Sequence, residues 1–167
     1  MSASQRSATG IDFQVARELI SDPVNVRLLS ELSRDPRISM SALGRAIGLS
    51  APATSERFRR LLDAGVITAF RMDIDPRALG LPVSAWVRVR PGPGMLPKIA
   101  RLAQEVPEVT ECHRITGEDC FLLRVYASGI TEFEEVLDRF LLYGQTTSSI
   151  VQSSPVSPRP LPLPHQS

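Results

Sequence analysis

The stretch that decides the fold covers residues 39–67 and reads SMSALGRAIGLSAPATSERFRRLLDAGVI. Ser39 and Ser50 are suited to cap helix N-termini, because a serine hydroxyl accepts a hydrogen bond from a free backbone N–H of the first turn. Pro52 fits the first turn of the second helix, where its missing N–H costs little. Gly48 lies between the helices and suits the sharp turn that ends the first one. The stretch therefore predicts two helices joined by a three-residue turn, a helix-turn-helix arrangement.

A third helix is predicted just before this stretch. Asp22 is a good N-cap, Pro23 follows at the first helical position, and apolar residues then recur at helical spacing as far as Leu32. We therefore expect a three-helix domain over residues 22–66. We expect residues 1–21 to form a flexible arm that holds one short helix at most.

The hydrophobic period changes after residue 66. Phe70, Met72 and Ile74 alternate with polar residues, which is typical of a strand, so we expect residues 67–82 to form a hinge strand and linker. Residues 83–154 then follow the order strand, helix, strand, strand, helix, strand, which is the ferredoxin-like βαββαβ unit. The predicted fold class is α+β, a winged-type helix-turn-helix followed by a ferredoxin-like domain.

The last segment, residues 155–167, is rich in proline. Five of the ten residues from Pro155 to Pro164 are prolines, and proline fixes its own φ and donates no backbone hydrogen bond. We expect a flexible or semi-rigid tail that packs against no other element. A docking site for another protein is the alternative.

Basic side chains are concentrated in the helix-turn-helix. The whole chain carries a formal net charge of only +1. Residues 37–60 contain five arginines and one acid, Glu56, whereas residues 83–154 contain seven basic and nine acidic residues. This division suits a protein with one surface for nucleic acid and another for a different ligand. An ordinary solvated helix face is the alternative.

The second helix of the pair is the candidate recognition helix. In such helices the N-terminal residues meet base edges in the major groove of double-stranded DNA, and arginines further along reach phosphates. Small residues at its start let the backbone approach closely. The candidate DNA contacts are Ser50, Ala51, Pro52, Ala53, Thr54, Ser55, Arg57, Arg59 and Arg60.

Metal-binding and membrane-spanning patterns are not expected. Cys112, Cys120, His113 and His165 are the only cysteines and histidines, and they make a poor set of metal ligands. No apolar stretch reaches the roughly 18 residues of a membrane helix, and no secretory leader is visible. We therefore expect a cytoplasmic protein with reduced thiols and without a metal or cofactor.

Several segments, in their order and spacing, resemble the Lrp/AsnC (feast/famine) regulators over about residues 22–154. In the first half they are DPRIS (35–39), LGRAIGLS (43–50), RFRRL (57–61) and AGVI (64–67), followed by the hinge-like IDP (74–76). In the second half they are ITGEDCFLL (115–123) and TTSSIV (146–151).

The resemblance implies a sequence-specific DNA-binding transcriptional regulator, not an enzyme. It implies homodimers built through the second domain and assembled further into tetramers or octamers. It also implies a small-molecule effector, an amino acid or a related compound. The backbone N–H groups of a turn can bind the carboxylate of such a ligand. The residues that it places at the effector site are Gly117, Glu118, Asp119, Cys120, Gln145, Thr146, Thr147, Ser148 and Ser149.

Some positions leave alternatives open. The family often has aspartate where Cys120 stands, so the hairpin could take a different ligand or be a plain turn. It usually has an acid near the first helix start, where Asn25 stands, and we expect this difference to affect only capping or packing. Trp86 either lines a subunit interface or covers the outer face of the sheet. The sirohaem decarboxylases resemble the same family, so a tetrapyrrole enzyme using His113 and Arg114 is the alternative function.

Overall fold

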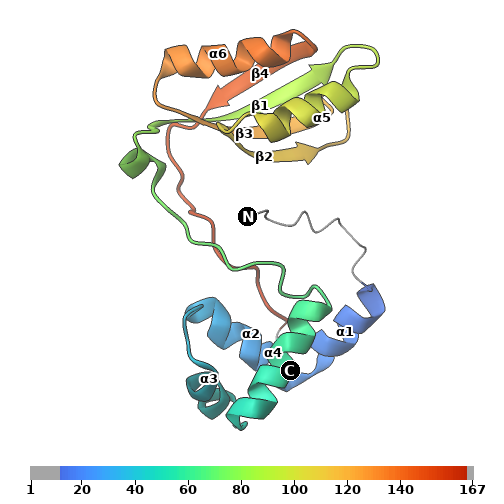
Figure 1. Cartoon of the computed structure of the whole chain (residues 1–167), viewed down its shortest axis with the longest axis vertical. Helices are drawn as coiled ribbons and strands as arrows, with labels where there is room; N and C mark the ends of the chain where they lie inside the picture. The colour runs from blue at the N-terminus through green and yellow to red at the C-terminus, as the bar shows by residue number, and fades with distance from the viewer. Residues whose placement is uncertain (1–11, 165–167) are drawn as a thin grey trace. The chain divides into compact units, whose positions relative to one another are not determined.

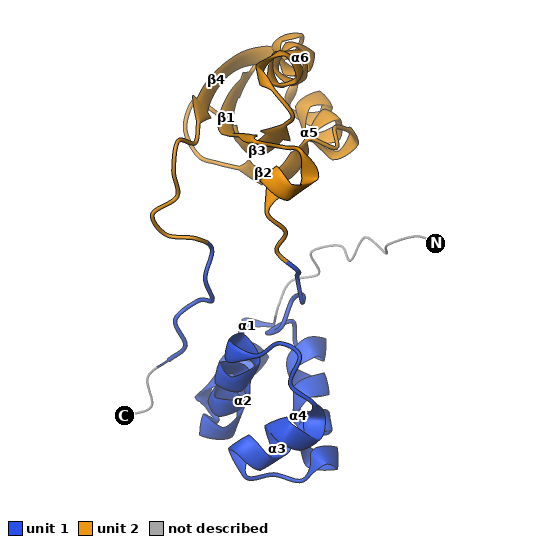
Figure 2. Cartoon of the chain, turned by 90° about the vertical axis from the view of Figure 1, so that its left-hand side faces the viewer, with its two compact units in different colours: residues 1–72, 158–167 blue, residues 73–157 orange. Residues whose placement is uncertain are grey.

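The computed structural model describes residues 12–164, which form two compact units connected by extended chain (Figure 1). The helical unit comprises the described residues up to 72 and from 158 onwards, and the sheet unit comprises residues 73–157 (Figure 2). The elements of the helical unit are α1 (Phe13–Ser21), α2 (Pro23–Arg34), α3 (Met40–Ile47) and α4 (Ala51–Asp63). Those of the sheet unit are the 3-10 turn η1 (Pro76–Leu79), β1 (Val83–Pro91), α5 (Leu96–Glu105), β2 (Val109–Arg114), β3 (Phe121–Ala127), α6 (Ile130–Leu141) and β4 (Gly144–Ile150).

The predicted caps set the helix ends in the helical unit. The side chains of Asp22, Ser39 and Ser50 each accept a hydrogen bond from a backbone N–H of the first turn, at 2.8, 3.2 and 3.4 Å. Gly48 ends α3 in the left-handed region, with φ at 77°. The helices bury one apolar core, formed by Leu28, Leu29, Leu32, Leu43, Ile47 and Leu61. The helix-turn-helix is therefore present at the predicted residues.

The hinge strand predicted within residues 67–82 is wrong for the single chain. Residues 68–75 belong to no strand, and η1 follows them. Phe70, Met72 and Ile74 alternate with polar residues as predicted, but each of them is at least half exposed. A strand needs a hydrogen-bonded neighbour, and none of the described segments pairs with this one.

The sheet unit has the predicted βαββαβ order. Its strands are arranged β2-β3-β1-β4, and every neighbouring pair is antiparallel. Helices α5 and α6 cover one face, as Figure 2 shows. Alternate residues of the central strands point to this face and form its core with the two helices. The main members of this core are Ala85, Val87, Val89, Ile99, Phe121, Leu123, Val125, Phe133, Val136 and Phe140.

The N-terminal arm holds the short helix that was expected there, whereas the C-terminal tail departs from expectation at one residue. Part of the predicted N-terminal arm forms α1, while residues 1–11 and His165 lie outside the described residues. In the proline-rich tail, Leu163 is half-buried and packs against the apolar core of the helical unit. The expectation of a tail without packing is therefore wrong at this residue, because one apolar side chain within reach of a core is enough to anchor an extended segment.

Candidate nucleic-acid interface and ligand site

The approach of α3 to the start of α4 depends on Gly44, a residue that sequence reasoning passed over. A Cβ at this position would lie 2.6 Å from the carbonyl oxygen of Leu49 and 2.9 Å from Oγ1 of Thr54. Both distances are too short for van der Waals contact, so only glycine lets the turn close over α3. The signal was a second glycine in the helix-turn-helix, at a helical position where glycine is otherwise unfavourable.

The outward face of α4 is polar and charged. Pro52, Glu56, Arg59 and Arg60 are exposed, and the small residues of the first turn are half-buried. Thr54 is fully buried, and its hydroxyl donates a 2.9 Å hydrogen bond to the carbonyl of Ser50. Thr54 is thus excluded as a direct DNA contact, because its side chain supports the helix start from inside the unit.

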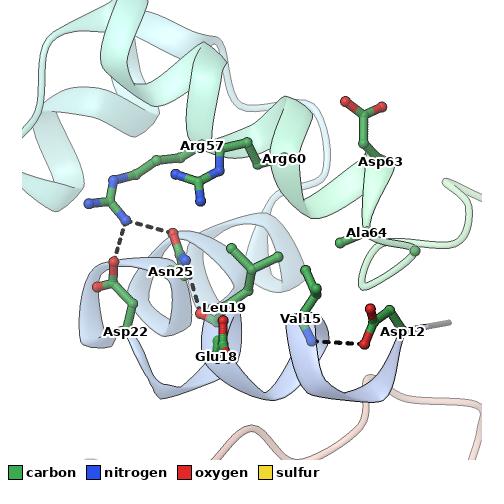
Figure 3. Close-up of a pocket in the computed structure, with 11 residues that line it drawn as sticks. Asp12, Val15, Glu18, Leu19, Asp22, Asn25, Arg57, Arg60, Asp63 and Ala64 are labelled. Atoms are coloured by element: carbon green, nitrogen blue, oxygen red, sulfur yellow. Dashed lines mark hydrogen bonds and ion pairs between the residues drawn. The ribbon is translucent and has the colours of Figure 1, made fainter.

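Arg57 extends from α4 towards the start of α2, where Figure 3 shows its guanidinium beside Asp22 and Asn25. Its guanidinium forms an ion pair with Asp22 and donates a 2.9 Å hydrogen bond to Oδ1 of Asn25. Asn25 is only 3% exposed, and its Nδ2 in turn donates a hydrogen bond to the carbonyl of Leu19, at 2.9 Å. The hydrogen bond from Arg57 holds the pKa of Asp22 below its usual value. Arg57 therefore ties α4 to the start of α2.

The two remaining arginines differ in their surroundings. Arg59 lies 3.2 Å from the carboxylate of Glu56, one turn earlier on the same helix, and both side chains are exposed. Among the described residues, no side chain pairs with Arg60. Arg60 also borders an open cavity of about 700 Å³ between α1 and the second half of α4 (Figure 3). This cavity is in the helical unit and contains none of the predicted effector residues.

In the sheet unit, the predicted hairpin acids meet two arginines of β1. Asp119 lies 3.5 Å from Nη1 of Arg88 and 3.6 Å from Nε of Arg90, and Glu118 forms an ion pair with Arg90. Gly117 takes a φ of 108° in the turn, which favours glycine. Sequence reasoning missed both arginines, because their alternation with buried valines predicted only a strand with one polar face.

The same arginines separate the hairpin from the other half of the predicted effector site. Strand β1 lies between β3 and β4, with Arg88 opposite Thr147 and Arg90 opposite Gln145. Directly paired residues of a sheet share a face, so Gln145, Thr147 and Ser149 lie on the arginine face. Thr146 and Ser148 are opposite the buried Val89 and Val87 and point to the other face. The structure therefore brings together only part of the predicted set.

The chemistry of this face suits a zwitterion. A guanidinium forms two parallel hydrogen bonds with a carboxylate, and a carboxylate accepts hydrogen bonds from an ammonium group. Cys120, at the end of the turn, is half-buried and weakly polar, and its Sγ lies 3.8 Å from the carbonyl of Glu118.

Aromatic residues occupy the other end of the same face. The guanidinium of Arg124 lies 4.9 Å from the ring centroid of Trp86 and 5.1 Å from that of Tyr126. In the sheet unit, α5 and α6 both lie on the opposite face (Figure 2). This aromatic cluster therefore has no covering layer within its own unit.

Residues 12–164, which the structure describes, have neither a metal-binding cluster nor a membrane-spanning helix. They contain no group of three or more histidine, cysteine or acidic side chains placed to hold a metal ion. None of their helices has the length and apolar character needed to cross a membrane.

Comparisons with known proteins agree with both units. A winged helix-turn-helix DNA-binding model matches residues 21–68, and a Lrp/AsnC ligand binding domain model matches residues 84–161. The chain is 32% identical to the transcriptional regulator LrpC of Bacillus subtilis over 132 residues, which are 79% of this chain and 92% of that protein. The chain belongs to the Lrp/AsnC family of transcriptional regulators. It is thus a DNA-binding regulator and not an enzyme, which removes the tetrapyrrole-enzyme alternative.

Solved structures of Lrp/AsnC regulators have the same fold. The structure of LrpC from Bacillus subtilis is 31% identical, with a TM-score of 0.77 over 82% of this chain and 98% of that one. A feast or famine regulatory protein from Mycobacterium tuberculosis, complexed with L-methionine, is 32% identical. Its TM-score is 0.77, over 86% of this chain and 99% of that one.

Proposed function

We propose that α4 is the recognition helix of this Lrp/AsnC regulator and enters the major groove of double-stranded DNA. The observation that carries the proposal is its outward face, where small residues precede two exposed arginines. Ser50, Ala51, Pro52, Ala53 and Ser55 approach the bases, and Arg59 and Arg60 bind phosphates. Arg57 acts indirectly, because its ion pair with Asp22 fixes the orientation of α4.

A gel-shift titration with DNA from the regulator's own promoter region tests this function. We expect binding that prefers one sequence over random competitor DNA and weakens as the salt concentration rises. If no promoter or selected DNA shows this preference, the assignment of α4 to DNA reading fails. We expect the regulator to act in the cytoplasm, where its DNA is.

We also propose that the arginine face of the sheet unit binds an amino acid or a related small molecule. Arg88 and Arg90 would hold the carboxylate, and Glu118 and Asp119 the ammonium group. The backbone of Gly117 and Cys120 and the side chains of Gln145, Thr147 and Ser149 complete the polar surroundings. The complex of the mycobacterial relative with L-methionine supports this ligand class.

A thermal-shift screen of the twenty amino acids tests the ligand proposal. A ligand that binds only the folded state raises Tm, by an amount that grows with its concentration over Kd. Glu118→Gln combined with Asp119→Asn is the matched variant, because it removes both charges with little change of shape. A flat screen, or an unchanged shift in the double variant, counts against an α-amino acid at this face.

We propose further that the chain forms homodimers through the uncovered sheet face, and tetramers or octamers from these. The Trp86–Arg124–Tyr126 cluster supports this, because aromatic and arginine side chains are enriched at protein interfaces. Light scattering coupled to size exclusion gives the mass. We expect Trp86→Ala to shift the mass towards the monomer, and an unchanged mass would place the interface elsewhere.

A further inference from the structure

The end of the proline-rich tail is anchored on the DNA-binding helices. Leu163 is half-buried and packs against the core of the helical unit, together with residues of α1, α2 and α4 such as Leu19, Val24 and Phe58. This contact joins residues that are far apart in the sequence. Both family models end before Leu163, since the ligand-domain match stops at residue 161. The anchor is thus a feature of this chain outside both matched regions.

The contact is selective within the tail. Leu161 is 85% exposed and Val156 is 64% exposed, although both are as apolar as Leu163. Unspecific adhesion of an apolar tail would cover these side chains as well. The prolines at every second position from Pro158 to Pro164 restrict φ and lower the entropy that the segment loses on docking. A single leucine can therefore hold it.

Docking changes how the two units are connected. The chain leaves the helical unit after residue 72 and returns to it at residue 158, so the sheet unit is inserted between two segments of the helical unit. Strand β4 ends at Ile150, and twelve residues separate it from Leu163. Such a segment spans about 40 Å at most. The strand that carries five of the nine predicted effector residues is therefore linked by a short segment to the DNA-binding helices.

We propose that the tail is an intrachain ligand of the DNA-binding helices and, through Leu163, a second tether between the two units. This goes beyond the proposed function, which needs only the link through residues 73–82. The occupant of the apolar site is residue 163 of the same chain, and not an external protein that recognises proline-rich segments.

The test compares Leu163→Asp with Leu161→Asp in the full-length chain. Both variants add one negative charge to the tail, but only the first places it at the anchor. Hydrogen–deuterium exchange, followed by mass spectrometry, reports the opening of α2, α3 and α4, whose residues form the core beneath Leu163. We expect these helices to exchange about fivefold faster in Leu163→Asp, because the variant loses the partial burial of one leucine side chain. In Leu161→Asp we expect the wild-type exchange rate.

A second measurement addresses the tether. Small-angle scattering should show a larger maximum dimension for Leu163→Asp than for Leu161→Asp at the same oligomeric mass. Leu163→Met keeps the apolar contact, and we expect it to behave like the wild type in both experiments. A wild-type exchange rate or a wild-type maximum dimension in Leu163→Asp overturns the proposal. A wild-type exchange rate would also mean that the tail is free to bind an external partner.

Discussion

Arg60 provides the sharpest test of how α4 binds DNA. Its side chain is exposed and, among the described residues, has no ion-pair partner, so Arg60→Ala removes a positive charge without breaking an ion pair between described residues. Each phosphate that a protein neutralises adds about 0.9 to the slope of log K against log salt concentration. We therefore expect the slope to fall by about 0.9 for each copy of α4 bound.

The size of this effect is measurable. Between 50 and 200 mM salt the concentration rises fourfold, so a slope contribution of about 0.9 corresponds to a factor of about 3.5 in affinity for each α4. Fluorescence anisotropy titrations of labelled operator DNA at four or five salt concentrations give the slope. Arg60→Lys keeps the charge, and we expect it to retain the wild-type slope.

Arg57→Ala is the matched control on the same helix. It removes the same charge, but from a guanidinium already bound to Asp22 and Asn25. We expect an unchanged slope, together with a loss of about 1–3 kcal/mol in stability, because Oδ1 of the buried Asn25 loses its donor. If Arg57→Ala lowers the slope as Arg60→Ala does, or if Arg60→Ala leaves it unchanged, the division of roles between these arginines is refuted.

Three other predictions concern packing, pH and the ligand. Gly44→Ala should lower the denaturation midpoint of the helical unit, because the close contact of the new Cβ with the Leu49 carbonyl costs about 1–3 kcal/mol. This cost exceeds the about 1 kcal/mol by which alanine is favoured over glycine in a helix. Unchanged stability would show that the turn can move. Because the pKa of Asp22 is lowered in the folded state, its ionised carboxylate stabilises the fold at pH values above its unfolded-state pKa of about 3.9. This stabilisation is lost as the pH falls through the folded-state pKa. Denaturant midpoints between pH 7 and pH 3 should therefore fall more steeply for the wild type than for Asp22→Asn, and parallel curves would contradict the role of Arg57. Arg90→Ala should raise the effector Kd about tenfold or more by calorimetry, through the loss of a charge-assisted hydrogen bond, and an unchanged Kd would place the ligand elsewhere.

The sequence was sufficient for every feature that depends on near neighbours in the chain. Asp22, Ser39 and Ser50 cap their helices as predicted, since a cap acts on a backbone N–H only two or three residues away. The βαββαβ order followed in the same way, because alternation and helical spacing are visible within about ten residues. The prediction of a hinge strand was wrong because a strand depends on a hydrogen-bonded partner, which local alternation does not supply.

The functional details depended on contacts between distant parts of the chain. Arg57 and Asp22 are 35 residues apart, so no local pattern could show that this arginine pairs with an acid of the protein. The pairing of Arg90 with Glu118 and the docking of Leu163 are likewise contacts across the fold. The sequence by itself determined which helices and strands form and that one helix is basic. The tertiary structure alone decided which charges remain free to bind a ligand, because a charged side chain pairs with whatever the fold brings within a few ångströms of it.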